Sequence, residues 1–263
     1  MRSILLKILA LVSFLGVVVV NFLANFLPIN NVATGAVSDS YPNLFAPIGL
    51  TFSIWGVIYL ALFFFILYSF NVFGEVKRKD LVDKINIYFI ISSVANIVWI
   101  FLWHYDLIGL SIIAMITILV CLILIVNLIV FEKKPLSYGE YFLLRFPFSI
   151  YFGWITVATI ANITTFLVSI NWQGFGVSDV IWTIIILLVG AIIGVIVSIR
   201  NSDSAYVLVL LWAYFGILLK HISIDGFNLE YSSIISAVIF CMAVFVLVLG
   251  YLLKKYFLPE RVR

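Results

Sequence analysis

Long apolar stretches alternate with short polar connections along the whole chain. Eight of these stretches are long enough to cross a bilayer as a helix, which takes about 20 apolar residues. The apolar positions are continuous rather than alternating, a pattern that favours helices over the strands of a membrane barrel. We therefore expect an all-α, polytopic membrane bundle. The predicted spans are residues 4–27, 46–71, 85–104, 108–131, 145–169, 179–199, 205–222 and 232–253.

Composition and charge agree with this class and add an orientation. Of the 263 residues, 65% are hydrophobic and 10% are charged, whereas soluble domains carry about 25% charged residues. Lys and Arg gather in alternate connections, at 77–84, 133–134, 200 and 254–263. The positive-inside rule then predicts that both termini are cytoplasmic. We expect a multi-pass protein of the cell membrane, specifically a prokaryotic cytoplasmic membrane.

Three spans each place aromatic and amide side chains on one helical face. Residues three or four positions apart share a face, and an amide in hydrocarbon is costly without a partner. With the predicted topology, the three stripes lie at one depth in the outer half of the bundle. They predict an enclosed pocket in which Ala158 leaves room for a flat molecule. The predicted ligand-binding residues are Phe52, Trp55, Tyr59, Asn96, Trp99, Trp154, Ala158 and Asn162.

Simpler explanations exist for single members of these stripes. Trp103 and Trp172 lie near the ends of spans, where Trp often belongs to the interfacial aromatic belt. Asn96 and Asn162 can each serve only as a hydrogen-bonding link between neighbouring helices. The shared face and depth of the three stripes favour a pocket for the set as a whole.

The connection 28–45 is predicted to be irregular, because it is rich in Pro, Asn, Gly and Ser. It also contains apolar residues such as Val37 and Phe45, which a flexible linker does not need. Two interpretations stay open: a lid over the outer mouth of the pocket, or a packed surface loop without a ligand role. Asn21 and Asn25 lie four apart near the outer end of the first span, where they are expected to hold this loop or face the pocket.

The order of these residues resembles the translocator protein / tryptophan-rich sensory protein family, which has five membrane helices. In that family the second helix carries Pro, Phe, Trp and Tyr, the third Asn-x-x-Trp, and the fifth Pro, Trp, Ala and Asn. The matching residues are Pro47, Phe52, Trp55 and Tyr59 in the second span, Asn96 and Trp99 in the third, and Pro147, Trp154, Ala158 and Asn162 in the fifth.

The resemblance covers residues 1–172 and suggests an extended, divergent member. Pro147 lies further before Trp154 than is usual in the family. The lid also lacks the usual Trp-Tyr and Lys-Pro pattern. Residues 173–263 hold three additional spans that have no counterpart in a five-helix core. We therefore expect a translocator-like core followed by three extra helices.

The resemblance implies a protein that binds, translocates or senses a tetrapyrrole or a sterol-like lipid. The alternative is a secondary transporter of a small solute that uses all eight spans, although the span interiors lack the charged residue that ion coupling usually needs. An enzyme is not expected, and the porphyrin-degrading activity proposed for bacterial family members stays an open question. Membrane lipids are expected as partners, whereas no cofactor, metal or nucleic acid is.

Three smaller features also give expectations. Gly190 and Gly194 lie four apart in the sixth span, which favours close helix packing within the chain or, alternatively, a homodimer. Cys121 and Cys241 lie inside spans and are expected to be apolar packing residues. His104, followed two residues later by an Asp, is expected to lie on the surface.

Overall fold

The computed structural model describes residues 2–27 and 29–257, and this part of the chain contains helices but no strands. Eight helices are long and apolar enough to cross a membrane, so the predicted all-α membrane bundle is confirmed. The long helices are α1 (Arg2–Phe26), α3 (Ile54–Ser69), α4 (Lys79–His104), α5 (Ile108–Val130), α7 (Phe146–Ser169), α8 (Asp179–Asn201), α9 (Ser204–Ile222) and α10 (Ser232–Phe257).

Short helical segments fill several connections. The predicted lid forms a 3-10 turn and a short α-helix, and a further 3-10 turn leads into α3. The short segments are η1 (Ile29–Asn31), α2 (Thr34–Asp39), η2 (Gly49–Ser53), α6 (Tyr138–Glu140), η3 (Tyr141–Arg145) and η4 (Gly174–Gly176).

Two helices begin earlier than the apolar pattern predicts. The third span starts at Lys79 rather than at 85, and the fifth helical stretch starts at Tyr138 rather than at 145. In the second case Ser137 and Glu140 form a capping box, which starts a helix within a polar segment. Hydropathy alone therefore misses the polar first turns of these helices.

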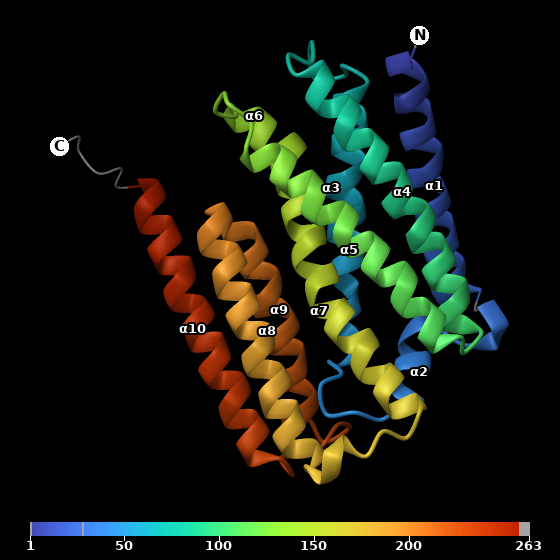
Figure 1. The fold of residues 1–263 in the computed structure, drawn as a ribbon, viewed down its shortest axis with the longest axis vertical. Helices are drawn as coiled ribbons and strands as arrows, with labels where there is room; N and C mark the ends of the chain where they lie inside the picture. The colour runs from blue at the N-terminus through green and yellow to red at the C-terminus, as the bar shows by residue number, and fades with distance from the viewer. Residues whose placement is uncertain (1, 28, 258–263) are drawn as a thin grey trace.

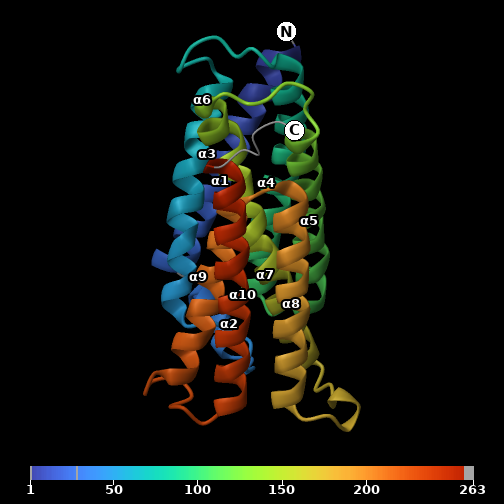
Figure 2. The same ribbon diagram turned by 90° about the vertical axis from the view of Figure 1, so that its left-hand side faces the viewer.

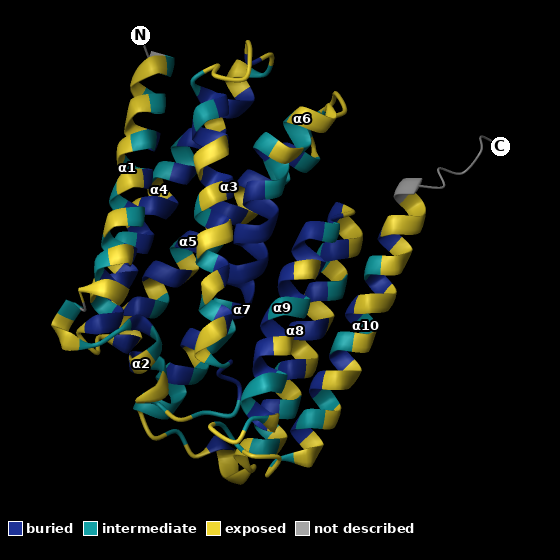
Figure 3. Cartoon of the chain, turned by 180° about the vertical axis from the view of Figure 1, so that it is seen from behind, coloured by how far each residue is buried: buried dark blue, intermediate teal, exposed yellow. Residues whose placement is uncertain are grey.

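The helices run side by side along the long axis of the molecule (Figures 1 and 2). One group contains α1, α3, α4, α5 and α7, and α8, α9 and α10 lie beside it, with α9 packed on α7. Buried residues face the spaces between helices, whereas exposed residues cover the outside (Figure 3). Many of these exposed residues are Ile, Leu, Val and Phe, as expected for surfaces that face lipid.

The glycines of α8 allow tight packing within the chain. A Cβ placed on Gly190 would come within 2.7 Å of the Tyr214 hydroxyl oxygen, and one on Gly194 would collide with Leu210 and Phe245. These contacts come from α9 and α10. The structure thus supports the interpretation of the two glycines as intrachain packing residues.

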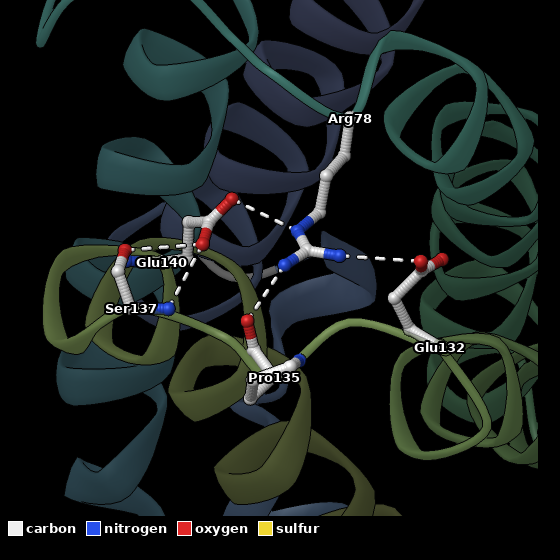
Figure 4. A network of polar contacts seen from close by, with 5 residues as sticks. All are labelled: Arg78, Glu132, Pro135, Ser137 and Glu140. Atoms are coloured by element: carbon white, nitrogen blue, oxygen red, sulfur yellow. Dashed lines mark hydrogen bonds and ion pairs between the residues drawn. The ribbon is translucent and has the colours of Figure 1, made fainter.

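Arg78 links two connections through its side chain (Figure 4). The connection between α3 and α4 lies at the end of the bundle where α1 begins (Figure 1). The Arg78 guanidinium donates from Nε to Glu140 at 2.9 Å and from Nη2 to the carbonyl of Pro135 at 2.8 Å. Its Nη1 lies 3.2 Å from Glu132. A largely buried charge needs such pairing, and here the pairing fixes the connection before α4 to the connection after α5.

Candidate functional site

A cavity of about 500 Å³ opens between α1, the lid and the start of α3. This volume falls within the usual range for small-molecule sites, roughly 300–1,000 Å³. Most of its lining is apolar or aromatic, and the described residues that line it include no charged side chain. The lining residues are Val18, Asn21, Phe22, Asn25, Phe26, Ala33, Thr34, Gly35, Gly49, Phe52, Ser53, Trp55 and Tyr59.

One wall of the cavity consists of Phe52 on η2 and Trp55 and Tyr59 on α3, which together we call the aromatic ladder. Trp55 stacks on Tyr59 with ring centroids 5.3 Å apart and planes inclined by 22°. Behind the ladder, buried Trp154 of α7 meets Phe52 edge-on at 5.8 Å and Trp55 edge-on at 6.2 Å. Trp154 therefore supports the wall from behind and does not line the cavity.

Amide side chains on α1 give the opposite wall its polar character. Asn21 donates through Nδ2 to the Val17 carbonyl and to Oδ1 of Asn96, both at 2.9 Å. Asn25 donates to the Asn21 carbonyl at 2.9 Å. Both Asn21 and Asn25 line the cavity, whereas Asn96 lies one layer behind them. The cavity thus offers a few polar atoms in an otherwise apolar space.

The Tyr59 hydroxyl stands out among the polar atoms at this site. It is buried and has no hydrogen-bond partner within the described part of the chain. Buried hydroxyls are almost always paired, so an unpaired one is a reason to look for a ligand or a water there.

Two of the remaining predicted pocket residues, Trp99 and Asn162, take part in a separate network. Trp99 donates from Nε1 to Oδ1 of Asn162 at 2.9 Å, and the Asn162 amide donates to the Ser111 hydroxyl, also at 2.9 Å. Ala158 is on the same helix as Asn162 and is only partly buried. Trp99, Ser111 and Asn162 meet between α4, α5 and α7, and neither they nor Ala158 line the cavity. Their role in ligand binding stays a prediction.

The lid closes the end of the cavity through α2. Ala33, Thr34 and Gly35 line the cavity from this side. The indole nitrogen of Trp103 donates to the Thr34 carbonyl at 3.1 Å, and the Thr34 hydroxyl lies 3.0 Å from Nε2 of His104. Residues 29–45 therefore pack against the bundle, as both interpretations require, and Ala33, Thr34 and Gly35 border the cavity. The role of this segment as a lid stays a prediction.

The prediction that His104 lies on the surface is wrong. Its side chain is 1% exposed, because α2 and η1 cover the end of α4. Nδ1 of His104 donates to the Ile29 carbonyl at 3.1 Å, and Asn30 donates to the His104 carbonyl at 2.9 Å. His104 is thus a tether for the lid, a role that depends on long-range packing and leaves no local sequence signal.

Asp106 pairs with the lid instead of with His104. Its carboxylate accepts from the Tyr41 hydroxyl at 3.3 Å. Burial and then the negative charge of Asp106 raise the pKa of Tyr41, so the phenol stays protonated and able to donate to a higher pH than a free tyrosine would. The far side of the lid is held by Lys220, whose ammonium lies 3.1 Å from Asp39.

Sequence reasoning placed Asn21 and Asn25 of α1 at the loop or at the pocket, but it missed the apolar residues of this helix that line the cavity. Val18, Phe22 and Phe26 repeat every four residues beside the two Asn residues of the same helix. This spacing is the same kind of signal that identified the aromatic ladder. The lid glycine and Ser53 carried no comparable signal.

The described residues include no group of three or more His, Cys, Asp or Glu side chains arranged to hold a metal ion. Cys121 and Cys241 are both buried as free thiols. The chemistry available in the cavity is therefore apolar contact, aromatic stacking and hydrogen bonding by neutral groups.

Comparison with known protein families gives one match. A family model described as TSPO-like protein matches residues 7–251. The match extends through α8 and α9 and into α10, beyond the part in which the sequence pattern alone resembled the five-helix core. No curated protein and no solved structure matches the chain significantly.

Proposed function

Because the chain belongs to the TSPO-like protein family, we propose that it binds a flat hydrophobic ligand in the cavity between α1, the lid and α3. It would act as a membrane-embedded binding, translocator or sensory protein rather than as an enzyme. The observation that carries this proposal is the aromatic ladder of Phe52, Trp55 and Tyr59 on one wall of a lidded cavity. Stacked rings and a few neutral polar atoms suit a planar molecule of limited polarity.

Charge narrows the ligand class. Burying a carboxylate without a nearby cation is costly, and the described lining has no Lys, Arg or His. The part of the ligand inside the cavity is therefore uncharged. This favours a sterol-like lipid, and a tetrapyrrole would have to keep its carboxylates outside the mouth.

Binding can be measured through the fluorescence of Trp55 in the ladder and of Trp154 behind it. The purified protein is titrated with dehydroergosterol, with protoporphyrin IX, and with its uncharged dimethyl ester, and tryptophan quenching is followed. We expect the sterol and the diester to bind more tightly than the diacid. Tighter binding of the diacid would contradict the charge argument, and no binding of any of the three would contradict the ligand class.

A matched pair of variants on α2 tests the location of the site. Ala33, the residue that caps the start of α2, lines the cavity, whereas Ala36 lies exposed within this short helix. Ala33→Trp should fill part of the cavity and weaken binding by at least about tenfold, while Ala36→Trp should leave it unchanged. Equal affinities for the two variants would place the ligand elsewhere.

We further propose that the protein resides in a prokaryotic cytoplasmic membrane with both termini inside. The connections around Arg78 and Glu132 lie at the same end of the bundle as the N-terminus (Figure 1), and the basic residues gather at this end. Cysteine labelling from either side of intact cells tests this orientation. External labelling of the 72–78 connection would overturn it.

A further inference from the structure

Helix α9 contacts the segment that leads from the lid into α3. The backbone N–H of Ile48 donates to the Gly216 carbonyl at 3.1 Å. The indole of Trp212 donates to the Thr51 carbonyl at 2.9 Å. Near the end of α9, the imidazole of His221 donates from Nε2 to the Leu44 carbonyl, also at 2.9 Å. Three contacts from one helix therefore hold residues 44–51.

Gly216 makes the closest of these approaches. A Cβ placed on Gly216 would collide with the Thr51 hydroxyl and lie 2.7 Å from Thr51 Cγ2 and 2.9 Å from Thr51 Cβ. Thr51 itself is 2% exposed, so its side chain has little room to move away. Only glycine at position 216 lets the segment lie this close to α9.

The held segment is part of the cavity wall. Thr51 belongs to η2 (Gly49–Ser53), and Gly49, Phe52 and Ser53 of the same turn line the cavity. A displacement of Thr51 is therefore transmitted to these residues through one or two peptide bonds. Phe52 is the first residue of the aromatic ladder and directly follows Thr51, so the position of its ring depends on the position of Thr51.

We propose that α9 is a positioning element of the ligand site, with Trp212, Gly216 and His221 fixing residues 44–51 so that η2 presents its side of the cavity. The inference rests on the proposed function of that cavity. It gives the C-terminal helices a role, since α8 and α10 pack on α9 and hold it against the core. None of the three residues lines the cavity, so they act through the segment they hold.

The first test is a double-mutant cycle at the glycine. Gly216→Ala is expected to weaken binding of dehydroergosterol by about tenfold. Thr51→Gly removes all three colliding atoms, so adding it to Gly216→Ala should bring affinity back to that of Thr51→Gly alone. If Gly216→Ala leaves affinity unchanged, or if Thr51→Gly does not restore it, the positioning role is overturned.

Two controls separate positioning from a general loss of structure. Gly250→Ala makes the same chemical change on α10, where an added Cβ meets nothing within 4 Å, and should leave affinity unchanged. Trp212→Phe keeps an aromatic ring but removes the donor to Thr51 together with part of the indole. It should fold and still weaken binding by a few fold, and an unchanged affinity would count against the role of that contact.

A second readout needs no ligand. In a Cys121→Ala/Cys241→Ala background, Ser53→Cys places one thiol in the exposed part of the cavity wall, and its reaction rate with a maleimide is measured. Gly216→Ala should change this rate severalfold, and Thr51→Gly should restore it. An unchanged rate overturns the positioning role, even if the sterol does bind. Failure of the sterol to bind the unmodified protein, together with a changed rate, would contradict only the proposed function.

Discussion

Two aromatic and amide clusters with similar sequence patterns have opposite structural outcomes. Between α4, α5 and α7, the indole of Trp99, the amide of Asn162 and the hydroxyl of Ser111 satisfy one another. Beside α1 and α3, Trp55 and Tyr59 border a cavity of about 500 Å³, and the Tyr59 hydroxyl has no partner within the described part of the chain. A stripe of Trp and Asn therefore predicts that polar groups are buried, and their hydrogen bonds decide whether the result is packing or a pocket.

The largest expected effect is at the ladder. Trp55→Leu should weaken dehydroergosterol binding by about 30-fold, because buried aromatic side chains at a binding site commonly contribute about 2 kcal/mol. Fluorescence of the bound sterol measures the change. Trp172→Leu, which lies outside the cavity lining, serves as the control. If both variants lose affinity equally, Trp55 does not differ in its role from a tryptophan outside the cavity.

Substitution in the packed cluster of Trp99, Ser111 and Asn162 should lower the stability of the protein rather than its affinity for the ligand. Asn162→Leu leaves the Trp99 indole and the Ser111 hydroxyl without their shared partner, at a cost of about 1–2 kcal/mol. Denaturant unfolding in detergent micelles measures this loss, and sterol affinity should stay close to that of the unmodified protein. A loss of affinity without a loss of stability would instead make Asn162 a ligand contact.

Tyr59→Phe tests the cavity in the same way as Asn162→Leu tests the packed cluster. Removing an unpaired buried hydroxyl should leave stability unchanged or slightly raised, while affinity for a ligand that presents an oxygen there falls by a few fold. Dehydroergosterol and its analogue without the 3-hydroxyl group are compared on both proteins. If Tyr59→Phe lowers the affinity for both ligands equally, the hydroxyl of Tyr59 does not contact the sterol oxygen.

The smallest effect is expected at the rim of the lid. Tyr41→Phe removes the donor to Asp106, a contact on an exposed surface, and should change stability by no more than about 0.5 kcal/mol. Because the pKa of Tyr41 is raised above its ordinary value, the phenol should keep its proton and this contact to a higher pH than a free tyrosine would. The maleimide labelling rate of Ser38→Cys is compared, at each pH, with that of the same variant carrying Tyr41→Phe, so that the thiol's own titration cancels. A large difference between the two rates at neutral pH would contradict this ranking.

Much of the fold could be predicted from the sequence, because each apolar span carries its own signal. The eight spans, their order and the family follow from local patterns. The site was harder to predict, because it depends on which helical faces pack against one another in the tertiary structure. Phe52, Trp55 and Tyr59 line the cavity as expected, whereas Asn96 and Trp154 lie behind its walls. The tethering of the lid by His104 required the tertiary structure.

The contact between Trp212 and Thr51 has a consequence for how the protein is made. The indole is synthesised 161 residues after the carbonyl that it binds, a delay of roughly 8–30 s at about 5–20 residues per second. Five membrane helices are synthesised during that interval, while residues 44–51 still lack their contacts with α9. The nascent cavity is therefore completed only when the penultimate helix arrives, and a ribosome stalled before residue 212 would leave the protein in the bilayer with an unfinished site.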